Sequence, residues 1–164
     1  MDAAFLKYPD AAKVGELLGQ KGLTLALAES CTGGLVSARI TGVPGSSLYY
    51  KGGVVSYDNR VKEKVLGVNA QDLKLYGAVS RQVARGMALG VKDLLEADIA
   101  LSVTGIAGPG GGTEDKPVGL VYIGLSSREI TKEYELHLAG SRDEIRRATV
   151  KEALEILRSY LTMQ

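Results

Sequence analysis

The chain has 164 residues, 45% of them hydrophobic and 24% charged, a size and balance typical of one globular domain, here residues 1–164. Its 20 Lys and Arg against 19 Asp and Glu give a net charge of +1, which lacks the basic excess of nucleic-acid-binding proteins and disfavours nucleic acid as a partner. The single cysteine excludes an internal disulfide, and the lack of a Cys/His cluster disfavours a zinc site. The sequence shows no signal peptide and no apolar run long enough to span a membrane, so we expect a cytoplasmic protein.

Helix and strand patterns alternate in the first part of the chain. Residues 10–21 carry apolar side chains at helical spacing, and residues 23–28 form a short apolar run that predicts a buried strand. The elements expected next, in order, are a helix ending at residue 40, a long Gly-, Ser- and Pro-rich loop over 42–53, a strand over 54–57 and a short helix over 59–66.

The second part of the chain continues the alternation. Its clearest helix spans residues 80–96, with an apolar stripe of Val83, Met87, Val91, Leu94 and Leu95, and with Gly86 and Gly90 on another face that permits close packing. A strand over 99–103, an antiparallel pair over 118–125 and 130–138, and a helix opened by a Ser141/Glu144 capping box follow, the helix with a stripe of Val150, Ala153, Leu154, Leu157 and Leu161. The order predicts an α/β fold, a three-layer α/β/α sandwich with a mixed, mostly parallel sheet.

Ser30 stands where the first strand gives way to a helix, and ligands of α/β sheets bind beyond such strand ends. Two interpretations stay open: Ser30 is the N-cap of the helix, or it is a nucleophile. The following Thr32-Gly33-Gly34 favours the second, because free backbone N–H groups at a helix start can stabilise an oxyanion or hold a phosphate.

Cys31 is the rival nucleophile, one residue further along. A cysteine nucleophile needs a base, and the single histidine, His137, falls on the polar face of the strand over 130–138. A solvent-facing histidine is a poor base, so we expect Cys31 to be a small buried hydrophobic residue.

Without a usable histidine, a serine needs another base, and lysine is the known substitute. Lys62 lies in the first turn of the helix expected from residue 59, where the helix dipole and burial would lower its pKa as a base requires. The alternative is a solvated surface lysine, which is what we expect of Lys64. Tyr57, at a strand end, is either part of the core or a hydroxyl that relays a proton.

Two further features could contact a ligand. The loop over 104–112 holds five glycines but matches neither the Walker loop nor the dinucleotide fingerprint, so it either wraps a ligand or is a flexible surface loop. Arg142, Arg146 and Arg147 near the start of the last helix could hold a phosphate or be solvated charges.

Taken together, several stretches of the chain resemble the CinA C-terminal domain family, the nicotinamide-nucleotide amidases. They are, in family order, Ala28-Glu29-Ser30-Cys31-Thr32-Gly33-Gly34, Gly45-Ser46-Ser47, Gly53-Val54-Val55-Ser56-Tyr57-Asp58-Asn59, Lys62, Gly77-Ala78-Val79-Ser80, Thr104-Gly105-Ile106-Ala107-Gly108-Pro109, Lys116-Pro117-Val118-Gly119, Arg142 and Arg146. They cover nearly the whole chain and are specific only in combination. The resemblance is to the stand-alone form, without the N-terminal domain that many members carry.

The resemblance implies hydrolysis of the carboxamide of nicotinamide mononucleotide to nicotinic acid mononucleotide and ammonia, without cofactor or metal, by a homodimer. It implies Ser30 as nucleophile, Lys62 as base and Tyr57 as assisting hydroxyl. The implied substrate-binding residues are Thr32, Gly33, Asn59, Thr104, Gly105, Ala107, Gly108, Arg142 and Arg146, with Thr104 and Gly105 at the amide or oxyanion pocket. A non-catalytic nucleotide-binding module and a dimerisation module are the alternatives, and retention of both Ser30 and Lys62 disfavours the latter.

Overall fold

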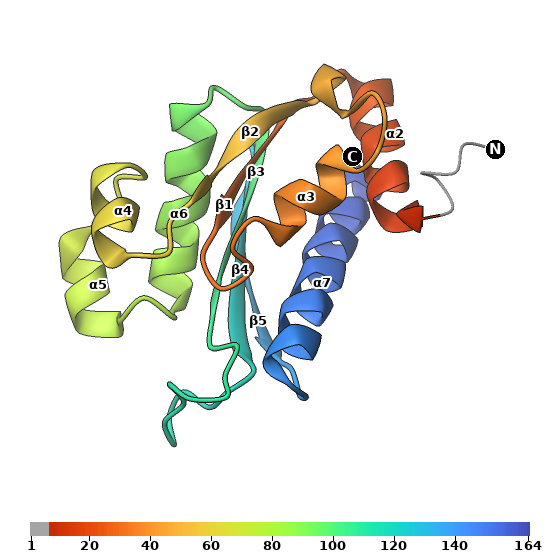
Figure 1. Ribbon diagram of the computed structural model, residues 1–164. Helices are drawn as coiled ribbons and strands as arrows, with labels where there is room; N and C mark the ends of the chain where they lie inside the picture. Colours follow the sequence, from red (N-terminus) through yellow and green to blue (C-terminus); the bar gives the residue numbers. More distant parts are fainter. Residues whose placement is uncertain (1–6) are drawn as a thin grey trace.

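A computed structural model describes residues 7–164 and contains one five-stranded sheet in the order β2-β1-β3-β4-β5 (Figure 1). The strands are β1 (Leu25–Glu29), β2 (Tyr50–Val55), β3 (Ile99–Gly105), β4 (Leu120–Ser126) and β5 (Thr131–His137). β1 pairs in parallel with β2 and β3, whereas β4 pairs antiparallel with β3 and β5. β4 alone therefore runs against the other strands, which confirms a mixed sheet with most strands in one direction.

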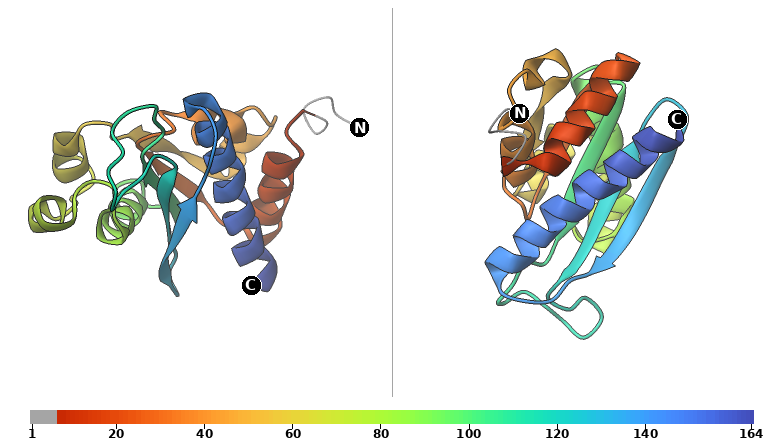
Figure 2. Two further views of the ribbon diagram at one scale, coloured as in Figure 1. Left: turned by 90° about the horizontal axis from the view of Figure 1, so that it is seen from below. Right: turned by 90° about the vertical axis from the view of Figure 1, so that its right-hand side faces the viewer.

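Helices cover both faces of the sheet and make the three expected layers (Figures 1 and 2). One face carries α2 (Pro9–Lys21), α3 (Leu35–Thr41) and α7 (Arg142–Met163), and the other carries α4 (Asn59–Lys64), α5 (Ala70–Tyr76) and α6 (Arg81–Leu94). Within residues 7–164, no helix combines the length and apolar character needed to cross a bilayer.

The sheet separates two apolar cores because successive strand side chains point to opposite faces. In β1, Leu25 and Leu27 belong to the core beneath α2, α3 and α7, while Ala26 and Ala28 belong to the core beneath α6. All five β1 residues are buried, as expected for a central strand of a sheet covered on both sides. β1 therefore fixes the position of whatever follows its carboxyl end.

The segment 42–53 is not the uninterrupted loop that its composition predicts. Ser46–Leu48 forms a short 3-10 helix, and β2 already begins at Tyr50. Glycine serves close packing here: a Cβ on Gly53 would lie 3.0 Å from the Ser37 hydroxyl of α3 and 3.1 Å from the Leu27 carbonyl of β1. The edge strand expected over 54–57 therefore begins four residues earlier and ends two residues earlier, at Val55.

The middle helices also depart from the sequence prediction. α5 was not anticipated, because none of its residues is buried and it has no apolar stripe to recognise. Leu94 was assigned to the stripe of α6 but is 49% exposed, since it lies in the last turn, beyond the two cores. Val83, Met87 and Val91 are buried as predicted.

α7 opens as the sequence predicts. The Ser141 hydroxyl accepts from the Glu144 N–H at 3.2 Å, and the Glu144 carboxylate accepts from the Ser141 N–H at 2.7 Å. All members of the expected stripe are buried. This cap fixes the first turns of α7, which carry Arg142 and Arg146, beside the carboxyl ends of β1 and β3 (Figure 1).

α6 packs closely on the segment that follows α4, as the spacing of Gly86 and Gly90 suggested. A Cβ on Gly90 would lie 1.7 Å from the Leu66 carbonyl oxygen, and one on Gly86 would lie 3.6 Å from Val68. Only glycine fits at position 90 without moving the backbone of the neighbouring segment.

Gly90→Ala should lower the free energy of unfolding by about 1–3 kcal/mol or more through overpacking. The matched control is Gly19→Ala in α2, where a Cβ meets nothing within 4 Å, and where the gain in helix propensity should stabilise by about 0.5–1 kcal/mol. Urea unfolding of both variants measures the difference. Equal effects at the two positions would contradict the packing described.

Candidate active site

Ser30 begins the turn that leads from β1 to α3. Its N–H donates to the Val103 carbonyl at 2.9 Å, which extends the β1–β3 pairing by one residue. The N-cap of α3 is Gly34 and no side chain caps that helix by the usual geometry, so the N-cap interpretation of Ser30 is wrong. The Ser30 hydroxyl lies instead 3.1 Å from the amine of Lys62.

Lys62 is 1% exposed, so its alternative interpretation as a surface lysine is wrong, whereas Lys64 is exposed as expected. The Lys62 amine donates to the carbonyls of Ser56 at 2.5 Å and Tyr57 at 3.2 Å, beside the Ser30 hydroxyl. Burial lowers the pKa of Lys62, and the nearby Asp58 carboxylate opposes that shift. The dipole argument does not hold, because α4 has six residues and Lys62 belongs to its last turn as much as to its first.

Glu29, directly before Ser30, is a buried residue whose contacts with the turn the sequence pattern did not reveal. Its carboxylate is 1% exposed and accepts five hydrogen bonds of 2.7–3.0 Å, from the N–H groups of Gly34, Val36 and Ser37 and the hydroxyls of Thr32 and Ser37. An acidic residue just before a helix start was the available signal.

Glu29 therefore occupies the start of α3, which we expected to offer free N–H groups to a ligand. In the turn itself, the Gly33 N–H donates to the Ser30 carbonyl at 3.0 Å. The N–H groups of Cys31 and Thr32 donate to no acceptor among residues 7–164. The expectation of free amides is thus corrected to these two.

Cys31 is buried, as predicted. Burial raises the pKa of its thiol to about 11, and the Glu29 carboxylate adds to the shift, so the thiolate is scarce at neutral pH. His137 lies on the exposed face of β5, where its ring contacts the Glu135 carboxylate at 2.8 Å. It is far from Cys31 in the sheet order, so Cys31 has no histidine base.

A cavity of about 240 Å³ opens at Ser30. It is lined by Ser30, Cys31, Tyr57, Gly105, Ile106, Ala107, Gly108, Gly110, Gly111 and Arg142. The glycine-rich loop after β3 therefore forms a wall of the cavity that holds the Ser30 hydroxyl. This position agrees with the rule that ligands of α/β sheets bind beyond the carboxyl ends of strands.

The cavity gathers six of the residues that the resemblance implied and leaves six outside. Inside are Ser30, Tyr57, Gly105, Ala107, Gly108 and Arg142. Of the others, Lys62 contacts the Ser30 hydroxyl without lining the cavity, and Asn59 and Gly33 are exposed. The Thr32 hydroxyl donates to the Glu29 carboxylate, and the Thr104 hydroxyl donates to the Ala78 carbonyl. Arg146 donates to the carbonyls of Cys31 and Thr32, both at 3.1 Å.

Tyr57 and Arg142 meet at the mouth of the cavity. Tyr57 is 61% exposed, which contradicts its interpretation as a core residue. Arg142 donates to the Tyr57 hydroxyl at 3.1 Å and to the Gly108 carbonyl at 2.8 Å, so it joins two walls of the cavity. Arg147 is exposed and paired with Asp143 at 2.8 Å, as expected of a solvated charge.

No three His, Cys, Asp or Glu side chains within residues 7–164 lie close enough together to ligate a metal ion. The chemistry that this site can perform rests on a serine hydroxyl, a buried amine, two backbone amides and an arginine.

A family model described as the CinA C-terminal domain matches residues 8–161. A "CinA-like protein" of Acaryochloris marina is 55% identical over 150 residues, which cover 90% of this chain and 36% of that protein. A "CinA-like protein" of Dictyoglomus thermophilum is 53% identical over 148 residues, which again cover 90% of this chain and 36% of that protein. The chain thus spans about a third of the length of these curated relatives.

Solved structures share the fold over nearly the whole chain. The competence/damage inducible protein CihA from Agrobacterium tumefaciens is 42% identical, with a TM-score of 0.91 and 94% of each chain covered. The competence damage-inducible protein A from Klebsiella pneumoniae is 34% identical, with a TM-score of 0.92 and coverage of 94% of this chain and 96% of that one.

The lowered pKa of Lys62 makes stability depend on pH. Unfolded, its amine keeps a proton up to about pH 10.4, while the folded protein releases it earlier, so the unfolded state binds more protons and stability rises with pH over that window. Lys62→Met should lose this rise, whereas Lys64→Met should follow the wild type. Urea unfolding between pH 7 and 10 measures the three slopes.

Cys31 titrates in the opposite sense, since its pKa is raised and the folded state holds its proton longer. Cys31 is present in all three proteins, so the part of its shift that comes from burial is common to them, and only the smaller part that comes from Lys62 is lost in Lys62→Met. Identical slopes for Lys62→Met and the wild type would contradict a lowered pKa of Lys62.

Proposed function

The chain belongs to the CinA C-terminal domain family, and on this premise we propose that it hydrolyses the carboxamide of nicotinamide mononucleotide to nicotinic acid mononucleotide and ammonia. The proposed mechanism uses Ser30 as nucleophile and Lys62 as base, through an acyl-enzyme. The observation that carries the proposal is the 3.1 Å contact between the Lys62 amine and the Ser30 hydroxyl, at the end of a cavity.

The surroundings of the amine suit a base. A neutral amine has two N–H donors and one lone pair, and two carbonyls, of Ser56 and Tyr57, stand ready to accept the two hydrogens. The lone pair is then directed at the third neighbour, the Ser30 hydroxyl. Burial favours the neutral form, since desolvation disfavours the ammonium.

Each step of the reaction then has a donor and an acceptor. Ser30 Oγ attacks the carboxamide carbon while its proton passes to the Lys62 amine. The tetrahedral intermediate collapses to an ester on Ser30, and Lys62 returns the proton to the departing ammonia. A water molecule, deprotonated by Lys62, then attacks the ester carbon. The bond to Ser30 Oγ breaks, Lys62 returns the proton to Ser30 Oγ, and the acid leaves. The pyridinium ring withdraws electrons from the carbonyl and assists both attacks.

The side of the cavity that carries Arg142 and Tyr57 suits the rest of a nucleotide. Arg142 has five N–H donors, of which two are used by Gly108 and Tyr57, so it retains donors for a phosphate. Tyr57, partly free in solvent, is proposed as the assisting hydroxyl, and Gly105, Ala107 and Gly108 as the backbone wall along the ring. No cofactor is needed for this hydrolysis.

We also propose that the enzyme acts in the cytoplasm as a homodimer, as the resemblance implies. The names of the relatives refer to competence and damage. A net charge of +1 gives no support to a direct contact with nucleic acid.

Ser30→Ala should abolish release of ammonia from nicotinamide mononucleotide, because within residues 7–164 no other nucleophilic side chain is hydrogen-bonded to the Lys62 amine. Cys31→Ala should keep most activity, since the Cys31 thiol is protonated and lacks a base. A coupled ammonia assay with both purified variants measures this. Loss of turnover in Cys31→Ala with activity retained in Ser30→Ala would reverse the assignment, and an inactive wild type would favour a non-catalytic binding module.

Lys62→Arg should be nearly inactive, because a guanidinium stays protonated and cannot accept the Ser30 proton. In the wild type, kcat should rise with pH through an apparent pKa below that of free lysine and then level off, since only neutral Lys62 is competent. Lys64→Arg, at an exposed position of the same helix, is the matched control and should keep the wild-type profile.

The measurement is a pH–rate profile of the three proteins. Substantial turnover by Lys62→Arg would mean that position 62 supplies charge and does not accept a proton.

A further inference from the structure

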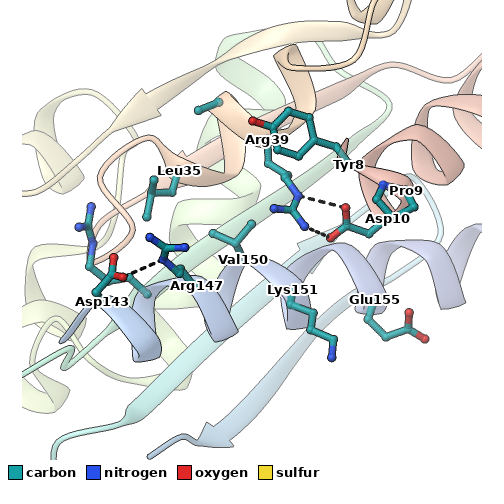
Figure 3. Close-up of a pocket in the computed structure, with 12 residues that line it drawn as sticks. Tyr8, Pro9, Asp10, Leu35, Arg39, Asp143, Arg147, Val150, Lys151 and Glu155 are labelled. Atoms are coloured by element: carbon teal, nitrogen blue, oxygen red, sulfur yellow. Dashed lines mark hydrogen bonds and ion pairs between the residues drawn. The ribbon is translucent and has the colours of Figure 1, made fainter. Parts of the chain in front are cut away.

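Arg146 approaches the nucleophile turn from the side opposite to the cavity. It lines a groove of about 690 Å³ between α2, α3 and α7, and it is absent from the lining of the cavity at Ser30. Figure 3 shows this groove along α7, with Arg147 paired to Asp143 and Arg39 paired to Asp10. The Arg146 guanidinium therefore contacts the backbone of the turn and does not line the cavity in which a substrate would bind.

The contacts of Arg146 fix two peptide planes. Its Nε donates to the Cys31 carbonyl and one terminal nitrogen donates to the Thr32 carbonyl, so both carbonyls face α7. In a trans peptide the carbonyl and the following N–H point to opposite sides. The Thr32 N–H therefore points away from the groove.

The direction of the Cys31 N–H follows from the same rule, applied to the peptide between Ser30 and Cys31. The Ser30 carbonyl accepts from the Gly33 N–H inside the turn, so the Cys31 N–H points outward from the turn. Cys31 is 5% exposed and Thr32 is fully buried, and neither N–H has an acceptor within residues 7–164. Buried amides without an acceptor are rare and destabilising, so two in succession beside a nucleophile indicate an oxygen ligand.

We propose that the backbone N–H groups of Cys31 and Thr32 form the oxyanion hole for the intermediate on Ser30. Arg146 is the proposed positioning residue: it orients the Thr32 N–H directly, and the Cys31 N–H through the peptide of Gly33, whose N–H holds the Ser30 carbonyl. The proposal rests on the proposed hydrolysis at Ser30. The N–H of the residue after a nucleophile commonly serves this purpose. The guanidinium also draws electron density from the Cys31 carbonyl, which makes the Thr32 N–H of the same peptide a better donor. Arg142 alone is then left to hold the phosphate.

A kinetic comparison separates positioning from phosphate binding. Arg146→Ala should lower kcat at least about tenfold, with KM for nicotinamide mononucleotide within about twofold, because the oxyanion exists only in the transition state and intermediate. Nicotinamide riboside, which lacks the phosphate, should lose the same factor in kcat/KM. Added guanidinium ion should restore part of the rate of Arg146→Ala.

Arg147→Ala is the matched control, since Arg147 is the next residue, is paired with Asp143 and does not contact the turn. It should keep wild-type kcat and KM. Arg146→Lys keeps the charge but cannot bridge two carbonyls with a planar fork, so it should fall between the wild type and Arg146→Ala, and it replaces the alanine variant if that one fails to fold. A raised KM for the mononucleotide alone, with unchanged kcat, would assign Arg146 to the phosphate and overturn the proposal.

A second readout does not depend on the substrate. A fluorophosphonate probe should label Ser30 through a phosphoryl oxygen held in the same hole, so the labelling rate should fall in Arg146→Ala, stay unchanged in Arg147→Ala and vanish in Ser30→Ala. If the variants show this labelling pattern but the wild-type protein does not hydrolyse nicotinamide mononucleotide, the oxyanion hole is supported and the proposed substrate is rejected. Wild-type labelling and turnover in Arg146→Ala would reject the oxyanion hole alone.

Discussion

The buried amine of Lys62 is the constraint on which the site depends. Removing an amine from water is costly unless oxygen atoms replace its hydration, and here two of the three replacements are the carbonyls of Ser56 and Tyr57. These residues directly follow β2, while Ser30 directly follows β1. The parallel register pairs Glu29 with Val55, and the Ser56 N–H donates to the Glu29 carbonyl at 2.8 Å. The contact between nucleophile and base is therefore a product of strand register.

Glu29 is a second buried acid or base near the site, and its carboxylate is hydrogen-bonded to the turn and the start of α3 and not to Lys62. Its carboxylate accepts five bonds from the start of α3 and its flanking residues, and it forms no ion pair within residues 7–164. A direct contact with Lys62 would favour the ammonium and spoil the base. By binding backbone N–H groups instead, Glu29 holds the turn after Ser30 in place. The amine keeps the lowered pKa that burial gives it.

The sequence predicts the layers, the capping box of α7 and the strand that ends before Ser30, because these depend on local patterns of apolar and capping residues. It left open whether Lys62 is buried, since lysine is ordinarily exposed. The contact of Lys62 with Ser30 also depends on the register of β2, and Gly52 and Gly53 made the start of that strand look like a loop. Arg142 and Arg146 are four residues apart, so the helical period places them on one face of α7. Which of them faces the cavity depends on where the turn after β1 crosses that face, and the sequence alone does not specify it.

The glycine-rich loop after β3 is a second case in which composition alone did not decide the structure. Its composition left open a flexible surface loop, but close packing requires three of its five glycines, Gly105, Gly108 and Gly112. A Cβ on Gly105 would lie 2.7 Å from Val121, and one on Gly108 would lie 2.6 Å from Val118, where φ is also +78°. The loop is thus a wall held against the start of β4, and Arg142 ties it to Tyr57 across the cavity. Ser30 is 9% exposed beside this wall, and low exposure to water strengthens the interactions of the amine and the two free amides with a developing charge.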